Sequence, residues 1–296
     1  MRFSSVDDVV KQLRSAMYIA DRRVATAVYL ADRLGKPLLI EGPAGVGKTE
    51  LAKAVSACTS LDLVRLQCYE GLDEARALYE WNYRKQLLRI QADEAREHHW
   101  EEIEESIFDE PFLLERPLLH AIRAQEPVVL LVDEIDRTEF EFEAFLLELL
   151  SDFQVTIPEL GTIRAEHPPY VVLTSNRTRE LGDALRRRCL YLYMEHPSLE
   201  KEVRIIRARQ PEAGERLARE VGRFVRALRG RELVKSPGVA ETLDFTQALL
   251  TLRQDALEPD VVTQTIGCLL KDRHDLETLT PTEVLALVAS AREDTP

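Results

Sequence analysis

A glycine-rich segment that follows a short apolar run constrains this sequence more than any other feature. Residues 42–49 read GPAGVGKT and match the pattern G-x-x-x-x-G-K-[ST] without a gap. The run before it, Pro-Leu-Leu-Ile at 37–40, is typical of a buried strand, and the ELAKAVSAC after it favours a helix. In this strand, loop and helix order the pattern predicts a phosphate-binding loop, with a plain glycine-rich turn as the alternative.

Each residue type in this loop has a chemical role. Glycines let the backbone wrap around phosphates and direct N–H groups at them. Lys48 supplies a cation to the β and γ phosphates of a nucleoside triphosphate, and the Thr49 hydroxyl is a predicted magnesium ligand. The predicted nucleotide-binding residues are Gly42, Pro43, Ala44, Gly45, Val46, Gly47, Lys48, Thr49, Glu50 and Asp133.

A second apolar run ends in two carboxylates. Residues 128–132 read VVLLV, and Asp133 and Glu134 follow directly. We expect Asp133 to hold magnesium through water at the carboxyl end of a strand. Glu134 is placed to orient and deprotonate the attacking water. An acidic pair after a strand is common, but downstream of a phosphate-binding loop it indicates hydrolysis of ATP with magnesium.

Two further polar segments, at 175–176 and 186–188, are also candidates for contact with ATP. The apolar run at 170–174 ends in Ser175 and Asn176, and an amide there can hydrogen-bond the γ-phosphate or the attacking water, or simply start a turn. Residues 186–188 are three arginines at the end of a short helix. Cations favour that end of a helix in any case, and the sharper interpretation is an arginine that reaches the γ-phosphate of a neighbouring subunit.

The order of apolar runs predicts the fold class and the domains. Five runs of the buried-strand kind alternate with helical segments up to residue 194, which favours a mainly parallel sheet covered on both faces. From Ser198 onward only helical segments follow. We therefore predict an α/β domain over residues 1–196 and a helical domain over 197–296.

Composition narrows the class of partner and the compartment. The net charge of −13 disfavours a nucleic-acid partner and favours proteins. No apolar run approaches the roughly 18 residues of a membrane span, and acids interrupt the N-terminus where a signal peptide needs an apolar segment. We expect no integral membrane segment, a cytoplasmic chain and reduced cysteines, because no two cysteines are closely spaced. The acidic stretch at 93–110, with His98 and His99, is interpreted as a solvated helix face rather than a metal site.

With these motifs in hand, the sequence resembles AAA+ ATPases of the MoxR family over almost the whole chain. The segments GPAGVGKT, VVLLVDEID, VVLTSN and DALRRRC occur in the order found in that family. More narrowly, RLQCYEGLDEARALYEWNYRKQLL and SPGVAETLDF resemble the CoxD-type subgroup. That subgroup is associated with maturation of aerobic carbon monoxide dehydrogenase and related molybdenum hydroxylases.

The resemblance implies a fold and an assembly. It implies a P-loop AAA+ αβα core with a parallel five-stranded sheet, followed by a smaller all-α lid. Such chains form rings, usually hexamers, with ATP bound between subunits. Residues 153–163 fall where this family inserts a hairpin that is expected to face the pore or the client.

The resemblance also implies roles for single residues. Asn176 matches sensor 1, and Arg188, with Arg187 beside it, matches the arginine finger; with Glu134 these are the implied catalytic residues. Gly238 stands where many relatives have the arginine of Ser-Pro-Arg, so the usual sensor 2 arginine is missing. The candidates to replace it are Arg223, Arg226 and Lys235.

The function implied is a Mg-ATP-dependent chaperone in metalloenzyme assembly. Its expected partners are further copies of the chain, a protein with a von Willebrand factor A domain and a metalloenzyme client, with peripheral membrane association as an option. A nucleic-acid loader is an alternative, because one fold serves many functions. Others are a nucleotide-gated scaffold with little turnover, suggested by Gly238, and a small-molecule kinase, against which Asn176 and the arginine cluster argue.

Overall fold

The computed structural model describes residues 2–94 and 107–293, which divide into two compact units. We call the first the sheet unit; it comprises residues 1–12, 22–41 and 52–193. The second, the helical unit, comprises residues 13–21, 42–51 and 194–296. The domain boundary expected after residue 196 stays a prediction.

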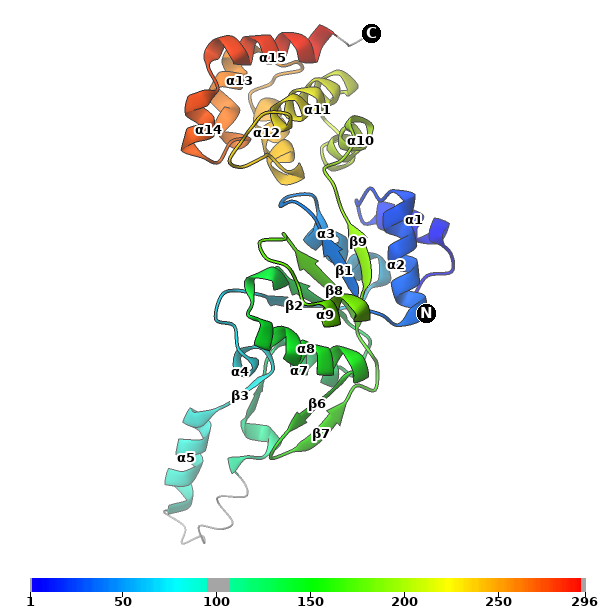
Figure 1. Cartoon of the computed structure of the whole chain (residues 1–296), viewed down its shortest axis with the longest axis vertical. Helices are drawn as coiled ribbons and strands as arrows, with labels where there is room; N and C mark the ends of the chain where they lie inside the picture. Colours follow the sequence, from blue (N-terminus) through cyan, green and yellow to red (C-terminus); the bar gives the residue numbers. More distant parts are fainter. Residues whose placement is uncertain (1, 95–106, 294–296) are drawn as a thin grey trace. The chain divides into compact units, whose positions relative to one another are not determined.

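A five-stranded parallel sheet forms the centre of the sheet unit (Figure 1). Three of its strands are buried along their whole length, as expected for strands covered on both faces. The strand order is β2-β5-β8-β1-β9, and every pairing is parallel. The strands are β1 (Leu38–Glu41), β2 (Leu63–Gln67), β5 (Val129–Asp133), β8 (Tyr170–Ser175) and β9 (Leu190–Tyr193). The predicted α/β fold with five parallel strands is confirmed.

Polar residues gather at the edge where all five strands end, which we call the carboxyl edge. The register sets Gln67 opposite Asp133, and it sets Glu41 opposite Ser175 on one side and Tyr193 on the other. Ligands of open α/β sheets bind at this kind of edge.

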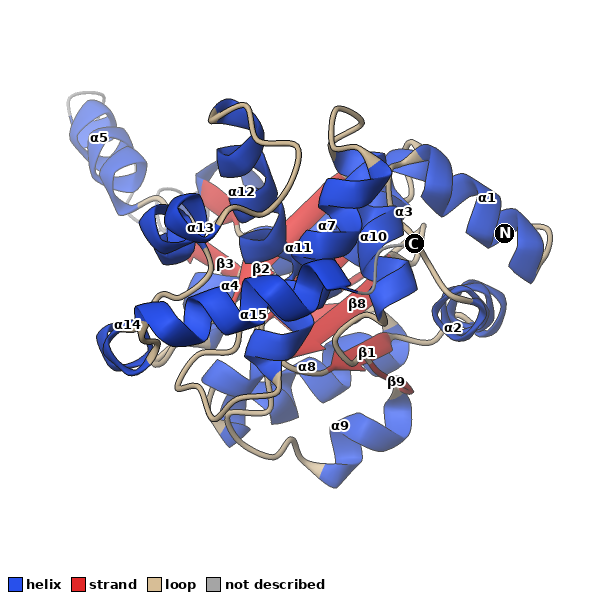
Figure 2. Ribbon diagram, turned by 90° about the horizontal axis from the view of Figure 1, so that it is seen from above, coloured by secondary structure: helices blue, strands red, loops and turns tan. Residues whose placement is uncertain are grey.

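Helices cover both faces of the sheet. In Figure 2, α3 lies on one side of the strands, and α8 and α9 lie on the other. The buried residues of α7 share one core with those of α8 and α9, so α7 covers the same face as these two helices. The helices in or entering this unit are α1 (Val6–Ser15), α2 (Arg22–Leu34), α3 (Lys48–Thr59), α4 (Glu74–Ala77), α5 (Tyr83–Glu94), α7 (Pro117–Arg123), α8 (Phe140–Asp152) and α9 (Asp183–Arg188), with short 3-10 turns at Glu110–Phe112 and Ile135–Arg137.

Two small antiparallel pairs extend the sheet unit. Strand β3 (Tyr79–Trp81) pairs with β4 (Leu113–Glu115). Strand β6 (Gln154–Ile157) pairs with β7 (Gly161–Arg164) in a hairpin that overlaps the predicted insertion. The role of that hairpin in contacting a client stays a prediction.

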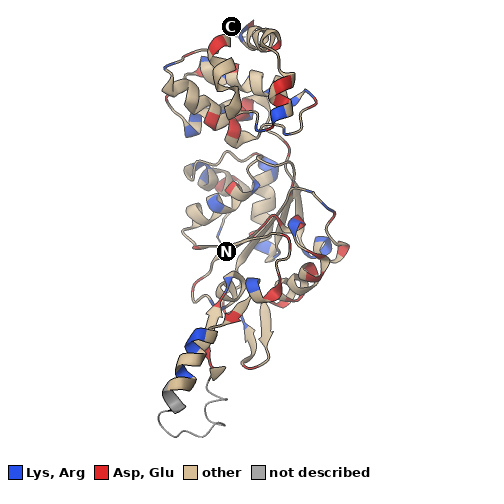
Figure 3. Cartoon of the chain, turned by 90° about the vertical axis from the view of Figure 1, so that its left-hand side faces the viewer, with Lys and Arg blue, Asp and Glu red and all other residues tan. Residues whose placement is uncertain are grey.

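The helical unit contains no strand within residues 194–293. Its core includes Phe224 and Phe245, whose rings stack at 6.0 Å. Acidic and basic residues are interspersed along its helices (Figure 3). The helices are α10 (Leu199–Arg209), α11 (Glu215–Arg229), α12 (Val239–Thr251), α13 (Pro259–Thr265), α14 (Arg273–Thr278) and α15 (Pro281–Glu293), with a 3-10 turn at Ile266–Cys268. In the described part of the chain, no helix is both long and apolar enough to span a bilayer.

Candidate functional site

The predicted phosphate-binding loop has a backbone that only glycine tolerates at three positions. Gly42, Gly45 and Gly47 have φ of 156°, 75° and 93°. A Cβ on Gly42 would also lie 2.0 Å from the carbonyl oxygen of Met194. The glycines are therefore required by the shape of the loop, and that shape is the cradle that a chain of phosphates needs.

Lys48 is held close to this loop. Lys48 is the first residue of α3, and only 6% of it is exposed. Its Nζ donates to the carbonyl oxygens of Gly42 and Pro43, both at 2.7 Å. Next along the helix, Glu50 forms an ion pair with Arg209 of α10 at 2.5 Å. The Tyr18 hydroxyl donates to Gly47 O at 3.4 Å, and burial raises the pKa of that phenol.

The loop also contacts the N-terminus of α12 through its backbone. Gly45 O accepts a hydrogen bond from Val239 N–H at 2.8 Å. A Cβ added to Gly45 would meet Gly238 Cα at 2.8 Å, and one added to Gly238 would meet Gly45 Cα at 2.6 Å. The Glu241 carboxylate accepts from Gly238 N–H at 2.9 Å and so caps the helix. The glycine in place of the expected arginine therefore permits direct contact between two backbones.

The three candidates for the missing arginine are engaged elsewhere or exposed. Arg223 donates to Ala291 O at 3.3 Å, Lys235 N–H donates to Asp275, and Arg226 is exposed. Instead, Arg229 donates to Pro237 O at 2.7 Å and pairs with buried Glu202 through two 2.8 Å bonds.

The first predicted carboxylate, Asp133, is buried at the carboxyl edge with 1% exposure. Thr174 Oγ1 donates to one of its oxygens at 2.6 Å, and Arg65 Nη2 donates to the other at 2.6 Å. Sequence reasoning missed Thr174 and Arg65, because their proximity depends on the register of three strands.

The second carboxylate, Glu134, is held by side chains from two neighbouring strands. Asn176 Nδ2 donates to one carboxylate oxygen at 3.2 Å, and Gln67 Nε2 donates to the other at 3.2 Å. Arg137 Nε also lies 2.9 Å from the second oxygen. Glu134 itself has a left-handed backbone with φ of 59°. The structure thus brings together Glu134 and Asn176, two of the predicted catalytic residues.

Asp136 fixes the backbone around Asn176. The Asn176 N–H donates to Asp136 at 3.1 Å, while Thr178 donates through its N–H at 2.8 Å and through its hydroxyl at 2.7 Å. Burial opposes ionisation of this carboxyl, but the hydrogen bonds from Thr178 and Asn176 outweigh it and lower the pKa of Asp136. The residue lies within the VVLLVDEID motif, so its position was visible in the sequence while its role was not.

The three clustered arginines have different environments. Arg187 and Arg188 are exposed, and Arg188 Nε donates to Ser151 Oγ at 2.6 Å. Arg186 instead pairs with the buried carboxylate of Glu41 at 2.8 Å. Arg187 and Arg188 are therefore accessible from solvent, as a residue acting on a neighbouring subunit has to be.

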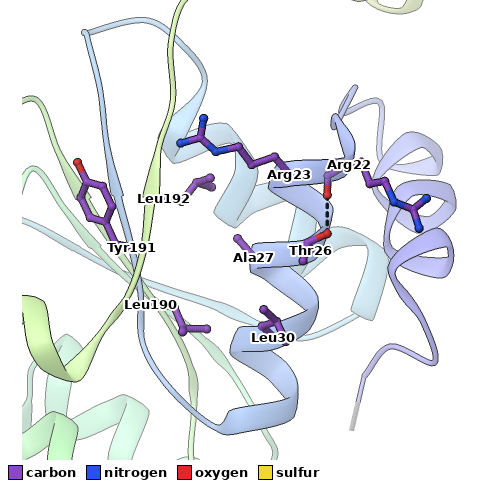
Figure 4. Close-up of a pocket in the computed structure, with 8 residues that line it drawn as sticks. All are labelled: Arg22, Arg23, Thr26, Ala27, Leu30, Leu190, Tyr191 and Leu192. Carbon is purple, nitrogen blue, oxygen red and sulfur yellow. Dashed lines mark hydrogen bonds between the residues drawn. The ribbon is translucent and has the colours of Figure 1, made fainter.

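A separate pocket of about 520 Å³ lies between α2 and β9 (Figure 4). It has a largely apolar wall with arginines at one end. The lining residues are Arg22, Arg23, Thr26, Ala27, Leu30, Leu190, Tyr191 and Leu192.

Each unit contains residues whose chemistry fits a group that the sequence predicts. In the helical unit, the glycine backbone and Lys48 suit phosphates, and Thr49 has a hydroxyl oxygen of the kind that magnesium binds. In the sheet unit, Asp133 has a carboxylate of the kind that magnesium prefers. Within residues 2–94 and 107–293, no group of three or more histidines, cysteines or acids is arranged to hold a metal by itself. Most of the acidic histidine-containing stretch, including His98 and His99, lies outside the described residues.

The sheet order, the glycine loop and the paired carboxylates define an ATPase of the AAA type. The family model described as AAA domain (dynein-related subfamily) matches residues 37–189, more than half of the 296-residue chain. The chain belongs to this family and is an ATP hydrolase.

The chain is similar to named ATPases in sequence and to solved structures in fold. The gas vesicle ATPase GvpN1 of Halobacterium salinarum is 25% identical over 83% of this chain and 72% of its own length. The gas vesicle ATPase GvpN of Haloferax mediterranei is 26% identical over 78% of this chain and 66% of its own. Two RuvB variants of Thermotoga maritima share the fold at 18% identity. The first has a TM-score of 0.53 over 98% of this chain and 84% of its own. The second has a TM-score of 0.51 over 90% of this chain and 73% of its own.

Proposed function

We propose that this ATPase uses magnesium and ATP to remodel a protein client within a ring of identical subunits. The observation that carries the hydrolytic part of the proposal is the position of Glu134, and the ring and the client are proposed from the family resemblance. Its carboxylate is held by Asn176 and Gln67 beside Asp133, at the edge from which β1 leads into the glycine loop.

Each predicted residue then has a role. Gly42–Thr49 holds the phosphates, with Lys48 at the β and γ positions. Thr49 and Asp133 would hold magnesium, which would supply positive charge to offset the charge that develops on the phosphates. Glu134 takes a proton from the attacking water, and the Asn176 amide holds the Glu134 carboxylate in place. Arg188, with Arg187, acts on the ATP of the neighbouring subunit.

The client is proposed to be a metalloenzyme of the molybdenum hydroxylase type, from the resemblance to the CoxD-type subgroup. A protein with a von Willebrand factor A domain would present it, in the cytoplasm or at a membrane surface. The names of the curated relatives favour a second candidate, in which the ATPase serves gas vesicles.

The hydrolytic part of the proposal predicts a selective loss in Glu134→Gln. Removing a general base costs about 10²–10⁴-fold in rate, so we expect kcat to fall by that range while binding of a fluorescent ATP analogue is kept. The matched control is Glu141→Gln, an exposed glutamate on α8, which should leave both values unchanged. Steady phosphate release by Glu134→Gln at the normal rate would contradict the assignment.

The same variant tests the client. Glu134→Gln should be captured from its native cells with ATP present, and the retained proteins identified. A molybdenum hydroxylase subunit or a von Willebrand-type protein would support the metalloenzyme client, and gas vesicle proteins would support the second candidate. Recovery of replication or repair proteins would overturn both.

A further inference from the structure

A buried carboxylate that the phosphate-binding loop does not use lies directly before it. Glu41 is the last residue of β1, and the chain enters the loop at Gly42. Only 1% of Glu41 is exposed. Because burying a carboxylate is costly unless cations or donors surround it, its partners indicate what the residue is for.

The partners of Glu41 come from three other segments. Arg186 Nη2 of α9 donates to Glu41 Oε2 at 2.8 Å, and the Tyr191 hydroxyl of β9 donates to the same oxygen at 2.9 Å. Arg177, directly after Asn176, has its Nε 4.0 Å from that oxygen. The strand that leads to the loop is thereby joined to α9, to β9 and to the segment after β8.

The direction of Tyr191 is set by the sheet. Tyr191 lies beside Leu39 in the register, and Leu39 and Glu41 share a face of β1 because side chains alternate. In Figure 4, Tyr191 lies on the opposite face of β9 from Leu190 and Leu192, and so turns away from α2. This direction brings the Tyr191 hydroxyl to Glu41.

The ion pair between Glu41 and Arg186 has only one hydrogen bond. The second carboxylate oxygen of Glu41, Oε1, and the Arg186 Nε are both buried, and neither has a hydrogen-bond partner among the described residues. Arginine and carboxylate commonly pair through two parallel hydrogen bonds. Glu41 Oε1 and Arg186 Nε therefore remain as an acceptor and a donor that could form the second bond in a tighter arrangement. A contact with two arrangements can transmit a change in β1 to α9.

We propose that Glu41 is a positioning residue that couples the loop strand to α9 through Arg186. Since α9 carries Arg187 and Arg188, this contact sets the arginines that act on the neighbouring subunit's ATP. The inference rests on the proposed function, in which the chain works as a ring with those arginines acting between subunits. A purely local role, in which Glu41 only keeps its own nucleotide site intact, is the alternative.

Mixing of variants separates the two roles. Glu41→Gln keeps an intact loop and Glu134 but loses the charge that holds α9, and alone it should bind a fluorescent ATP analogue within about twofold of the wild type. Its kcat should fall about tenfold, in the usual range for coupled sites. Lys48→Ala has no working nucleotide site but an intact α9. Mixed rings of the two should recover several-fold more activity than the sum of the separate variants.

Three further preparations make the result decisive. Arg186→Lys keeps the positive charge but cannot form two parallel hydrogen bonds with the Glu41 carboxylate. It should behave like Glu41→Gln and should likewise be rescued in mixed rings with Lys48→Ala. Glu80→Gln breaks a half-exposed pair with Arg116 in the sheet unit and should leave ATPase activity unchanged. Arg188→Ala mixed with Lys48→Ala tests the arginine finger itself.

The outcomes are distinct. If Arg188→Ala is not rescued, the intersubunit role fails and the inference about Glu41 falls with it. If Arg188→Ala is rescued while Glu41→Gln is not, or if Glu41→Gln loses nucleotide affinity, the proposed function stands and the role of Glu41 is wrong.

Discussion

At the scale of single residues, Asp136 shows how a buried carboxylate can fix the backbone next to a proposed catalytic residue, Asn176. Its three hydrogen bonds from Asn176 and Thr178 replace the partners that water would supply. An asparagine at this position offers one acceptor oxygen and places an amide against N–H donors. Asp136→Asn is therefore expected to lower the free energy of unfolding by about 1–3 kcal/mol in urea denaturation.

Asp183→Asn, at an exposed position on α9, is the control and should be neutral. The pH dependence gives a second measurement. Because the folded pKa of Asp136 lies below the ordinary value of 3.8, its contribution is complete above 3.8 and is lost as the pH falls through the lower folded value. The difference in stability between wild type and Asp136→Asn should therefore shrink below about pH 4. A difference that is constant down to pH 2 would contradict this explanation.

A local sequence pattern was enough to single out Glu134 and Asn176, which the structure brings into contact, because both follow apolar runs. It was not enough to find the residues that hold them. Gln67, Thr174 and Glu41 acquire their roles from the strand order β2-β5-β8-β1-β9, which fixes which strands are neighbours. A local pattern carries no information on that order, and these residues could not be assigned from sequence alone.

At the scale of elements, the contact between the phosphate-binding loop and α12 explains why residue 238 is a glycine and not the arginine that the family resemblance predicts. Many relatives have an arginine where this chain has Gly238, and the sequence offers Arg223, Arg226 and Lys235 only as possible replacements. The structure shows the α12 backbone itself on Gly45, at a distance that excludes any side chain. Close approach of two backbones depends on both glycines, which motif reasoning treats as unrelated.

Gly238→Ala should disturb this contact. The added methyl would lie 2.6 Å from Gly45 Cα, so the loop or the helix has to move. We expect the Kd for a fluorescent ATP analogue to rise about tenfold, a typical coupling between neighbouring groups. Gly214→Ala, at the N-terminus of α11, meets no atom within 4 Å and is the matched control. Equal affinities for wild type and Gly238→Ala would show that the contact has no part in binding.

At the scale of the whole molecule, the contacts group the loop with helices far along the chain. Residues 42–51 belong to the same compact unit as residues 194–296, although β1 and β2 on either side of them belong to the sheet unit. The five apolar runs were sufficient to predict the parallel sheet. They do not predict this grouping, because contacts between residues far apart in the chain, such as Gly45 with Gly238 and Glu50 with Arg209, leave no trace in apolar periodicity.

This grouping predicts that ATP protects a part of the chain beyond the loop. The Val239 amide donates to Gly45 O, so its exchange with solvent requires this hydrogen bond to open. Nucleotide at 100 times its Kd stabilises the bound state by about 2.7 kcal/mol, which corresponds to roughly 100-fold slower opening. Hydrogen exchange followed by mass spectrometry should show slowing at Val239 and the start of α12 when ATP is added. Protection confined to residues 42–51 would contradict the prediction.

The pairing of Gly45 with Gly238 also has a consequence during synthesis. All five strands of the main sheet lie before residue 194, so a nascent chain can pair them before α12 has been made. The carbonyl of Gly45 gains its partner only when Val239 leaves the ribosome. During translation, the sheet can therefore form before the phosphate-binding loop is complete. A chain that stops before α12 would contain all five strands but would lack the hydrogen bond from Val239 to Gly45.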